Sequence, residues 1–166
     1  MNFNIKYLET YRNLLATTEL QLGYQEFIKL FRFLRIELEK ELPDFSFSSN
    51  IVENNMDFAY FQLTDTDLRE KGVKIQVVFV HKSFRFEVWA SGYNRKTQCF
   101  YYNKLKNQPL KYYLNDNPER IDYIFKAEIE KDIELHSGDI VISKIKPVVL
   151  EMITFVKNHI DLCVIP

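Results

Sequence analysis

Apolar residues near the start of the chain recur every three or four positions, which is the spacing of one face of an α-helix. One such stripe runs from Phe3 to Leu15, and a second, wider band runs from Leu20 to Leu38. Pro43 follows the second band, and a proline disfavours the helical conformation of the residue before it. The pattern therefore predicts two helices, the second of which ends before Pro43.

Beyond the second helix the period changes to two residues, which is typical of β-strands. Apolar and polar residues alternate over Ile51–Gln62, and Asp57 lies on the more polar side of this predicted strand. A capped helical turn in "TDTDLREKG" separates it from a second strand, Lys74–His81, which is rich in β-branched residues. Lys82 and Ser83 are predicted to form a hairpin turn; because neither residue favours positive φ, a longer loop is the alternative.

The strand that returns from this turn has two unlike sides. Because successive side chains of a strand point to opposite faces of the sheet, an apolar set and a mixed set are predicted to lie on opposite faces. The apolar set is Phe84, Phe86, Val88 and Ala90, and the mixed set is Arg85, Glu87 and Trp89, the only tryptophan of the chain.

The second half of the chain alternates between the two periods. A helix is predicted from just after Gly92 to Leu105, and extended segments follow at Leu110–Leu114 and Ile121–Ile129. These segments add strands to the hairpin that precedes them.

The last predicted helix carries apolar residues from Val148 to Ile160, and Pro147 is placed in its first turn. A start near Asp139, with a kink at Pro147, also fits the pattern. The order of elements predicts an α+β fold, with a mainly antiparallel sheet of about five strands and with amino-terminal, middle and carboxyl-terminal helices packed on it.

Length and composition favour one domain. The chain has 166 residues, of which 46% are hydrophobic and 15% aromatic, so a single α+β domain over residues 1–166 with a continuous core is expected. The formal net charge is −1, from 22 basic and 23 acidic residues. Without a global field, contact with nucleic acid would need a local patch, and there is no strong nucleic-acid signal.

The compartment and the cofactors follow from what the sequence lacks. The amino terminus has neither the basic segment nor the apolar run of a signal peptide, and no window approaches the roughly 18 apolar residues of a membrane span. We therefore expect a cytoplasmic protein without a membrane partner. Cys99 and Cys163 are expected to be reduced thiols, and neither they nor the three histidines have the spacing of a metal site, so no metal and no cofactor is predicted.

The segment "FRFEVWASGYNRK" raises the first question of chemistry, because Arg95 and Lys96 follow a glycine turn at the predicted start of a helix. Cations there are unfavourable by roughly 0.3–1 kcal/mol each, so an anion is expected nearby. Asn94 as a cap, Gly92 as a point of close approach and Arg95 could together bind a phosphate or carboxylate. The alternative is an internal anion, Glu87 or Asp57, on a neighbouring strand.

Trp89 allows two interpretations as well. It either fills the core or forms the wall of a pocket in which an indole stacks on a base, a sugar or a guanidinium, with Tyr60 and Tyr93 extending the wall. A metal-dependent hydrolase or degenerate nuclease that uses Asp57 and Glu87 is a rival hypothesis. Its weakness is that Trp89 stands where a nuclease would carry a lysine.

A third hypothesis has no pocket, and the aromatic-rich helix from Tyr24 to Leu38 then forms an oligomeric or partner interface. Enzyme activity is left open, and no catalytic residue is assigned. The leading hypothesis is a small binding domain for an anionic small molecule or a protein partner. Its candidate ligand-binding residues are Asp57, Tyr60, Glu87, Trp89, Gly92, Asn94 and Arg95.

Four segments resemble a family of small bacterial proteins that is known only as a domain of unknown function. They are "LQLGYQEFIKLFRFLR", "ELPDF", "NNMDFAYF" and "KIQVVFVHKSFRFEVWASGYNRKTQ", and the last two carry Met-Asp-x-x-Tyr-Phe and Phe-Glu-Val-Trp-x-x-Gly-x-Asn signatures. Asn54, Asn55 and Ala90 depart from the family's pattern. The resemblance implies a fold and the same candidate face, but no reaction. The matching positions are Met56, Asp57, Tyr60, Phe61, His81, Phe86, Glu87, Trp89, Gly92, Asn94 and Gln98.

Overall fold

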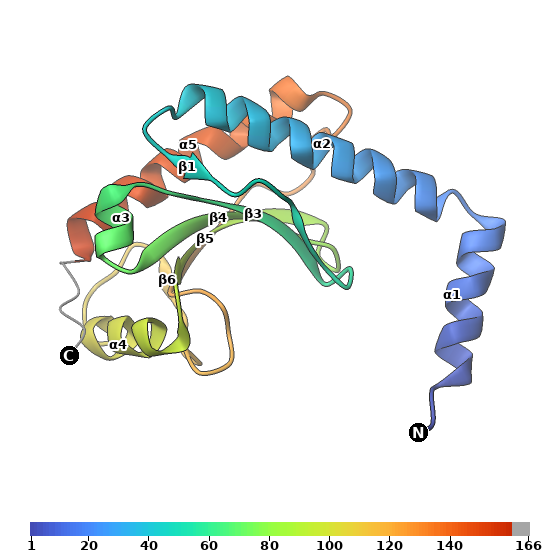
Figure 1. Cartoon of the computed structure of the whole chain (residues 1–166), viewed down its shortest axis with the longest axis horizontal. Coiled ribbons are helices and arrows are strands. Elements are labelled where there is room, and N and C mark those ends of the chain that lie inside the picture. The colour runs from blue at the N-terminus through green and yellow to red at the C-terminus, as the bar shows by residue number, and fades with distance from the viewer. Residues whose placement is uncertain (161–166) are drawn as a thin grey trace.

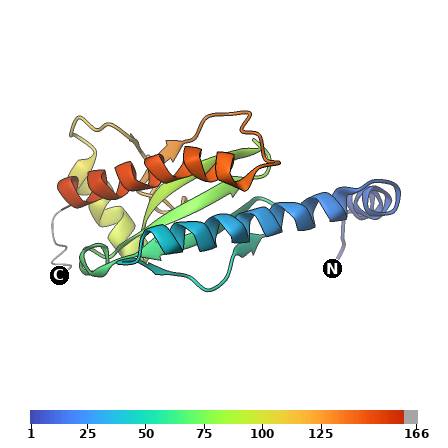
Figure 2. The same ribbon diagram turned by 90° about the horizontal axis from the view of Figure 1, so that it is seen from above.

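The computed structural model describes residues 1–160 and has an antiparallel sheet with helices on both of its faces. Helices α2 (Leu20–Glu41) and α5 (Gly138–His159) lie side by side across one face (Figures 1 and 2). Helix α4 (Arg95–Leu105) lies on the other side, at one end of the sheet (Figure 1). Helix α1 (Ile5–Thr17) projects away from the far end of α2.

The sheet has seven strands in the order β1-β3-β4-β5-β7-β6, with β2 also paired to β3, and every paired neighbour is antiparallel. The predicted α+β class is confirmed, although the strand count is higher than the five expected. The elements not yet given are β1 (Ser46–Phe47), β2 (Val52–Asn54), β3 (Phe58–Thr64), α3 (Thr66–Glu70), β4 (Val73–Val80), β5 (Arg85–Gly92), β6 (Tyr113–Leu114) and β7 (Phe125–Glu128).

The main core lies between α2, α5 and the sheet, and it forms because each strand points alternate side chains toward the helices. On β5 the predicted two-sidedness holds: Phe86 and Val88 are buried in this core, whereas Trp89 belongs to a smaller cluster with Val78 and Tyr123. The main core also takes Phe31, Leu34 and Leu38 from α2, Phe61 and Leu63 from β3, Ile75, Val77 and Phe79 from β4, and Val141, Ile145, Val149, Met152 and Val156 from α5.

The prediction of one strand over Ile51–Gln62 is wrong. The chain turns back at Asn55 and Met56, whose φ angles are 50° and 61°, and β2 pairs with β3 as a hairpin. Positive φ at two central residues defines a turn whose twist matches a hairpin, and asparagine tolerates that conformation well. Asp57 therefore lies in a turn rather than on a strand face.

The β4–β5 hairpin has the longer loop that was the alternative to a two-residue turn at Lys82 and Ser83. Strand β4 ends at Val80 and β5 begins at Arg85, so residues 81–84 form the connection. Phe84 has a φ of 48° and is largely exposed, which corrects its placement on the apolar face of the returning strand.

The last helix has the earlier of its two predicted starts. It begins at Gly138, with Ser137 as its cap, and Pro147 lies inside it rather than in its first turn. A Cβ at Gly138 would lie 2.3 Å from a ring carbon of Phe33, so the glycine lets α5 approach α2 closely. Among residues 1–160, no helix is long and apolar enough to cross a membrane.

Helix α1 contradicts the expectation that every helix packs on the sheet, because none of its residues is buried. Its apolar side chains remain exposed at the end of the molecule. The periodicity correctly predicted a helix. It could not predict which surface packs against the apolar face of that helix, since periodicity is a property of one helix alone.

A matched pair of leucines tests the position of the core. Leu34→Ala removes a fully buried side chain of α2, whereas Leu150→Ala removes a partly exposed one of α5. We expect the first change to lower the free energy of unfolding by about 2–5 kcal/mol and the second by less than about 1 kcal/mol. Urea denaturation followed by circular dichroism measures both, and equal losses would contradict the layer arrangement.

Candidate functional site

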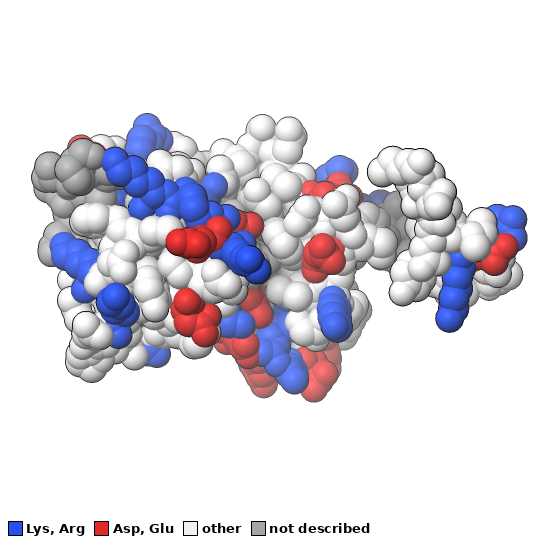
Figure 3. Space-filling model, turned by 90° about the horizontal axis from the view of Figure 1, so that it is seen from below, with Lys and Arg blue, Asp and Glu red and all other residues white. Residues whose placement is uncertain are grey.

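The face of the sheet opposite α2 and α5 contains a cavity of about 500 Å³. This size lies within the range of small-molecule sites. Basic and acidic side chains are interspersed on this side of the molecule (Figure 3). The cavity is therefore distinguished from the surrounding surface by its concave shape and its lining residues, and not by an excess of positive or negative charge.

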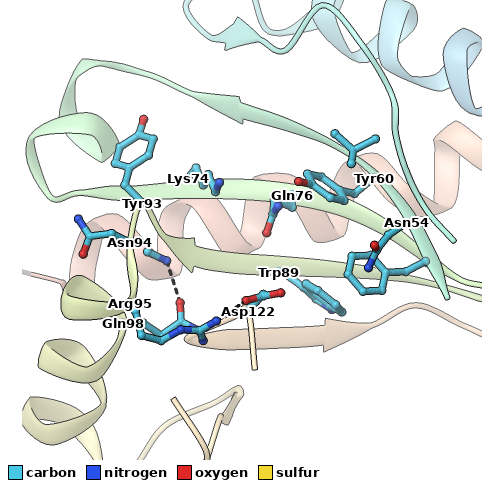
Figure 4. A pocket seen from close by; sticks show the side chains of 13 residues that line it. Asn54, Tyr60, Lys74, Gln76, Trp89, Tyr93, Asn94, Arg95, Gln98 and Asp122 are labelled. Carbon is cyan, nitrogen blue, oxygen red and sulfur yellow. Dashed lines mark hydrogen bonds and ion pairs between the residues drawn. The ribbon is translucent and has the colours of Figure 1, made fainter. Parts of the chain in front are cut away.

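Three neighbouring strands supply the floor of the cavity. Tyr60 comes from β3, Lys74 and Gln76 come from β4, and Trp89 comes from β5 (Figure 4). The register explains why they meet: Gln76 pairs with Trp89, and β3, β4 and β5 are adjacent, so residues of one parity share the face away from the helices. The β2 strand closes one end, and the turn before α4 closes the other.

Lys74 is the cation of the cavity without a carboxylate partner. No ion pair or hydrogen bond of its ammonium group occurs within the described chain, and the group lies over the Tyr93 ring, with 6.0 Å between Nζ and the ring centroid. Burial lowers the pKa of Lys74 below its usual value, and the nearby charge of Asp122 opposes part of that effect. An anion in the cavity would supply the missing partner.

Other polar groups of the cavity also have unused hydrogen-bonding capacity. Gln76 uses its side-chain oxygen to accept a bond from the Ser91 hydroxyl (2.5 Å), which leaves its amide N–H groups available. The side chains of Asn54 and Tyr60 make no hydrogen bond to any residue in 1–160. The pKa of Tyr60 is raised, first by burial and then by the charge of Asp122, so its hydroxyl remains a donor.

Glu87 and Trp89 satisfy one another inside the protein. The indole Nε1 of Trp89 donates to Glu87 Oε2 over 2.6 Å, and Lys126 Nζ lies 3.6 Å from Glu87 Oε1. Both residues are buried, and Trp89 is 7% exposed, so only a small part of its ring reaches the cavity. Glu87 does not line the cavity and serves to hold the indole.

Arg95 lines the cavity but already has its partners. Its guanidinium donates to Asp122 (2.7 Å) and to the carbonyl oxygens of Pro118 (2.9 Å) and Ile121 (2.6 Å). The internal anion is thus Asp122, in place of the expected Glu87 or Asp57. These bonds fasten the loop before β7 to the start of α4 and form one wall of the site.

Gly92 and Asn94 build the turn into α4. Asn94 caps the helix by accepting from the backbone N–H of Thr97 (2.9 Å), as its sequence position suggested. A Cβ at Gly92 would lie 3.0 Å from the backbone nitrogen of Gln98, so the group that approaches this glycine is the protein's own helix. Gln98 completes the turn by accepting from the Gly92 N–H and donating to the Tyr123 carbonyl (2.8 Å).

Asp57 lies outside this arrangement, exposed in the β2–β3 turn. Tyr60 pairs with Val78 and Val78 with Glu87, so Asp57 is three residues along the sheet and two strands across from Glu87. Strand geometry makes these offsets roughly 10 Å each, which is too far for two carboxylates to share a metal ion. No cluster of three metal-ligating side chains occurs within residues 1–160.

The cysteines lie apart from the cavity as well. Cys99 is a free, half-buried thiol of α4 and is not among the cavity residues, and Cys163 lies outside the described residues.

The sequence reasoning missed Lys74, Gln76 and Asp122. Lys74 and Gln76 share the parity of Val78 on a strand that is rich in β-branched residues, and the register of that strand places them beside Trp89. Asp122 falls in the extended segment predicted over Ile121–Ile129, whereas β7 starts only at Phe125 and Asp122 lies in the loop before it. No local pattern marks a loop carboxylate as the partner of Arg95.

The fold and the site together define a small α+β domain with a ligand-sized cavity on the open face of its sheet. A profile of the family described as "Domain of unknown function (DUF7000)" matches residues 4–160, and the chain belongs to this family. No curated protein and no solved structure shows significant similarity to the chain.

Replacement of Glu87 tests its role beside the indole. Glu87→Ala leaves the buried Trp89 N–H without its acceptor, while Lys126 keeps its bond to Glu128 (3.0 Å). We expect the change to lower the free energy of unfolding by about 1–3 kcal/mol and to change the Trp89 emission. Glu87→Gln keeps an acceptor oxygen and should preserve the emission. If the alanine variant matched the wild type in both measurements, the indole bond would have no structural role.

Tyr123 makes alkaline stability another test of the cluster under the cavity. Burial, with smaller contributions from Tyr113, Glu87 and Asp116, raises the pKa of Tyr123 to about 12 from 10.0. A raised folded-state pKa contributes stability that is complete below about pH 10 and is lost as the pH rises toward about 12. We expect Tyr123→Phe to reduce the fall in unfolding free energy across this window, and an unchanged slope would contradict the burial of the hydroxyl.

Proposed function

We propose that the cavity on the open face of the sheet binds a small molecule that carries an anionic group and a flat ring. The observation that carries this proposal is the unpaired ammonium group of Lys74 in a cavity whose other free polar groups include donors. A half-buried cation without a directly bonded counter-ion is unfavourable, and a phosphate or carboxylate would offset that cost.

The charge balance of the cavity supports an anionic ligand. Lys74 and Arg95 contribute two positive charges and Asp122 contributes one negative charge, so the site has one net positive charge. Because Arg95 and Asp122 neutralise each other at 2.7 Å, the uncompensated charge is that of Lys74. The Gln76 amide and the Tyr60 hydroxyl are donors on the adjacent floor positions.

The ring part of the proposal comes from the aromatic residues at the β2 end. Phe58 lies 5.5 Å from Trp89 and 6.1 Å from Tyr60, measured between ring centroids. Such a group offers faces and edges on which a flat ring can pack, with a gain of about 0.5–1.5 kcal/mol for each aromatic contact. An inorganic anion alone would leave this apolar end unfilled.

A small molecule fits this site better than a macromolecule does. The interspersed charges of the surrounding surface offer no basic track for a nucleic acid, and a concave cavity of about 500 Å³ suits a ligand of a few tens of atoms or fewer. Four positions of the two signatures, Tyr60, Trp89, Gly92 and Asn94, line this cavity, so the residues that carry the family resemblance gather at the proposed site. The proposal includes a cytoplasmic location, which the free thiol of Cys99 supports, and a bacterial origin, which only the family resemblance suggests.

Two lysine variants, one near the start of β4 and one in the turn that follows β4, test the proposal. Lys74→Met removes the cavity ammonium, and Lys82→Met makes the same change in the exposed turn at the opposite end of β4. The purified proteins are titrated with nucleoside monophosphates, aromatic carboxylates, sugar phosphates and phosphate, with neutral nucleosides as ligand controls, while Trp89 emission is followed. We expect Lys74→Met to weaken binding of a ring-bearing anion by about 10- to 100-fold, since a charge-assisted hydrogen bond contributes about 1.5–3 kcal/mol.

The control variant Lys82→Met should bind as the wild type does. Equal affinity for a nucleotide and its neutral nucleoside, or equal losses in both lysine variants, would contradict a role for the Lys74 charge. Saturable binding of inorganic phosphate with the same affinity as the ring-bearing anions would contradict the ring part of the proposal.

A further inference from the structure

Helix α1 is an amphipathic helix with an uncovered apolar side. At 100° per residue, Tyr7, Leu8, Tyr11, Leu14 and Leu15 fall on one side of the helix, and Lys6, Glu9 and Asn13 fall on the other. Phe3 lies just before the helix. Phe3, Tyr7 and Tyr11 are 71%, 70% and 57% exposed. The helix projects from the body as a separate arm, and most of its surface visible from below is uncharged (Figure 3).

An arm of this kind needs a partner for its apolar side. A helix of 13 residues is at the lower limit of what is stable alone in water, and α1 buries no residue against its own chain. Contiguous exposed apolar surface on this scale marks a surface for interaction with another protein.

The same chain carries an apolar groove near the base of the arm. The groove has a volume of about 860 Å³, and its apolar lining comes from the first half of α2, the two hairpin turns and the segment before α5. Leu30, Phe27 and Phe79 are among the lining residues, with Met56 and Phe84 exposed at the turns. Glu26 and Lys29 in the lining pair with each other at 2.5 Å, so they add no net charge.

The elbow between α1 and α2 keeps the arm out of the groove of its own chain. The backbone N–H of Thr18 donates to the Leu14 carbonyl (3.1 Å), which continues α1 to its last turn. The Thr18 hydroxyl oxygen accepts from the backbone N–H of Leu20 (3.3 Å), the first residue of α2. Folding α1 back along α2 would break these bonds, whereas a second molecule can present its groove without breaking them.

We propose that two copies of this chain form a symmetric dimer in which the apolar side of each α1 lies in the groove of its partner. Because arm and groove belong to the same sequence, one two-fold axis satisfies both. With roughly 200 Å² for a whole aromatic side chain, Phe3, Tyr7 and Tyr11 expose roughly 400 Å² on each arm. The exposed parts of these side chains on two arms sum to roughly 800 Å², and the two receiving grooves add surface of their own, which brings the interface into the size range of specific complexes.

Light scattering after size-exclusion chromatography of the full chain tests the dimer at micromolar concentration. The expected mass is twice that of the chain. Tyr11→Arg on the apolar side of the arm should raise the dimer dissociation constant at least about tenfold, and Asn13→Arg on the opposite side should not. Phe84→Asp and Met56→Glu test the groove at exposed turn positions and should weaken the dimer as Tyr11→Arg does.

Other outcomes would overturn the proposal. A dimer that is lost in Tyr11→Arg but kept in both groove variants means that the arms pair with each other. A monomeric wild type whose residues 5–17 resist hydrogen exchange means that the arm folds onto its own chain. A monomeric wild type with rapid exchange in the arm excludes a second copy as the occupant.

Discussion

The strict alternation of side chains across β3, β4 and β5 is the constraint on which the rest of this structure depends. One parity buries Phe61, Val77 and Val88 under α2 and α5, and the other brings Tyr60, Gln76 and Trp89 to the open face. A shift of one residue in any of these pairings would exchange the two faces. The core and the cavity are therefore set by the same register, and a sequence that fixes one fixes the other.

On the open face of the sheet, some charged side chains have hydrogen-bond or ion-pair partners within the protein and one does not. Glu87 holds the Trp89 indole, and Arg95 holds the loop of Asp122, so these charged groups serve the architecture of the cavity. Lys74 differs from them because its ammonium group makes no hydrogen bond or ion pair within residues 1–160, although the charge of Asp122 lies nearby. Rigid, internally paired walls around one free cation make a preorganised site, since little has to move when an anion binds.

Sequence patterning was most successful where local physics decides the structure. The periodicity located the helices and the β4–β5 hairpin, and the two sides of β5 were correctly separated at Phe86, Val88 and Trp89. It failed at Asn55 and Met56, because two left-handed residues in an alternating stretch convert one strand into a hairpin without changing the pattern. It also could not pair residues distant in sequence.

Contacts between residues that are distant in sequence determine most of the geometry of the site. Tyr60, Trp89, Gly92, Asn94 and Arg95 were candidates from the sequence, and they line one cavity, whereas Asp57 lies in a turn and Glu87 lies beneath the surface. The Arg95–Asp122 pair joins residues 27 positions apart through a loop without any motif. Likewise, Lys74 stands out as a candidate only after the register places it beside the aromatic floor.

The most direct test of the central claim is the location of binding on the molecule. Backbone amide NMR spectra of the labelled protein, recorded during titration with the ring-bearing anion of highest affinity, report which residues sense the ligand. The account predicts shifts concentrated at Tyr60, Lys74, Gln76 and residues 92–95, on the open face of the sheet. Shifts centred on Phe27 and Leu30 in the groove at the other end, with the open face unchanged, would contradict it.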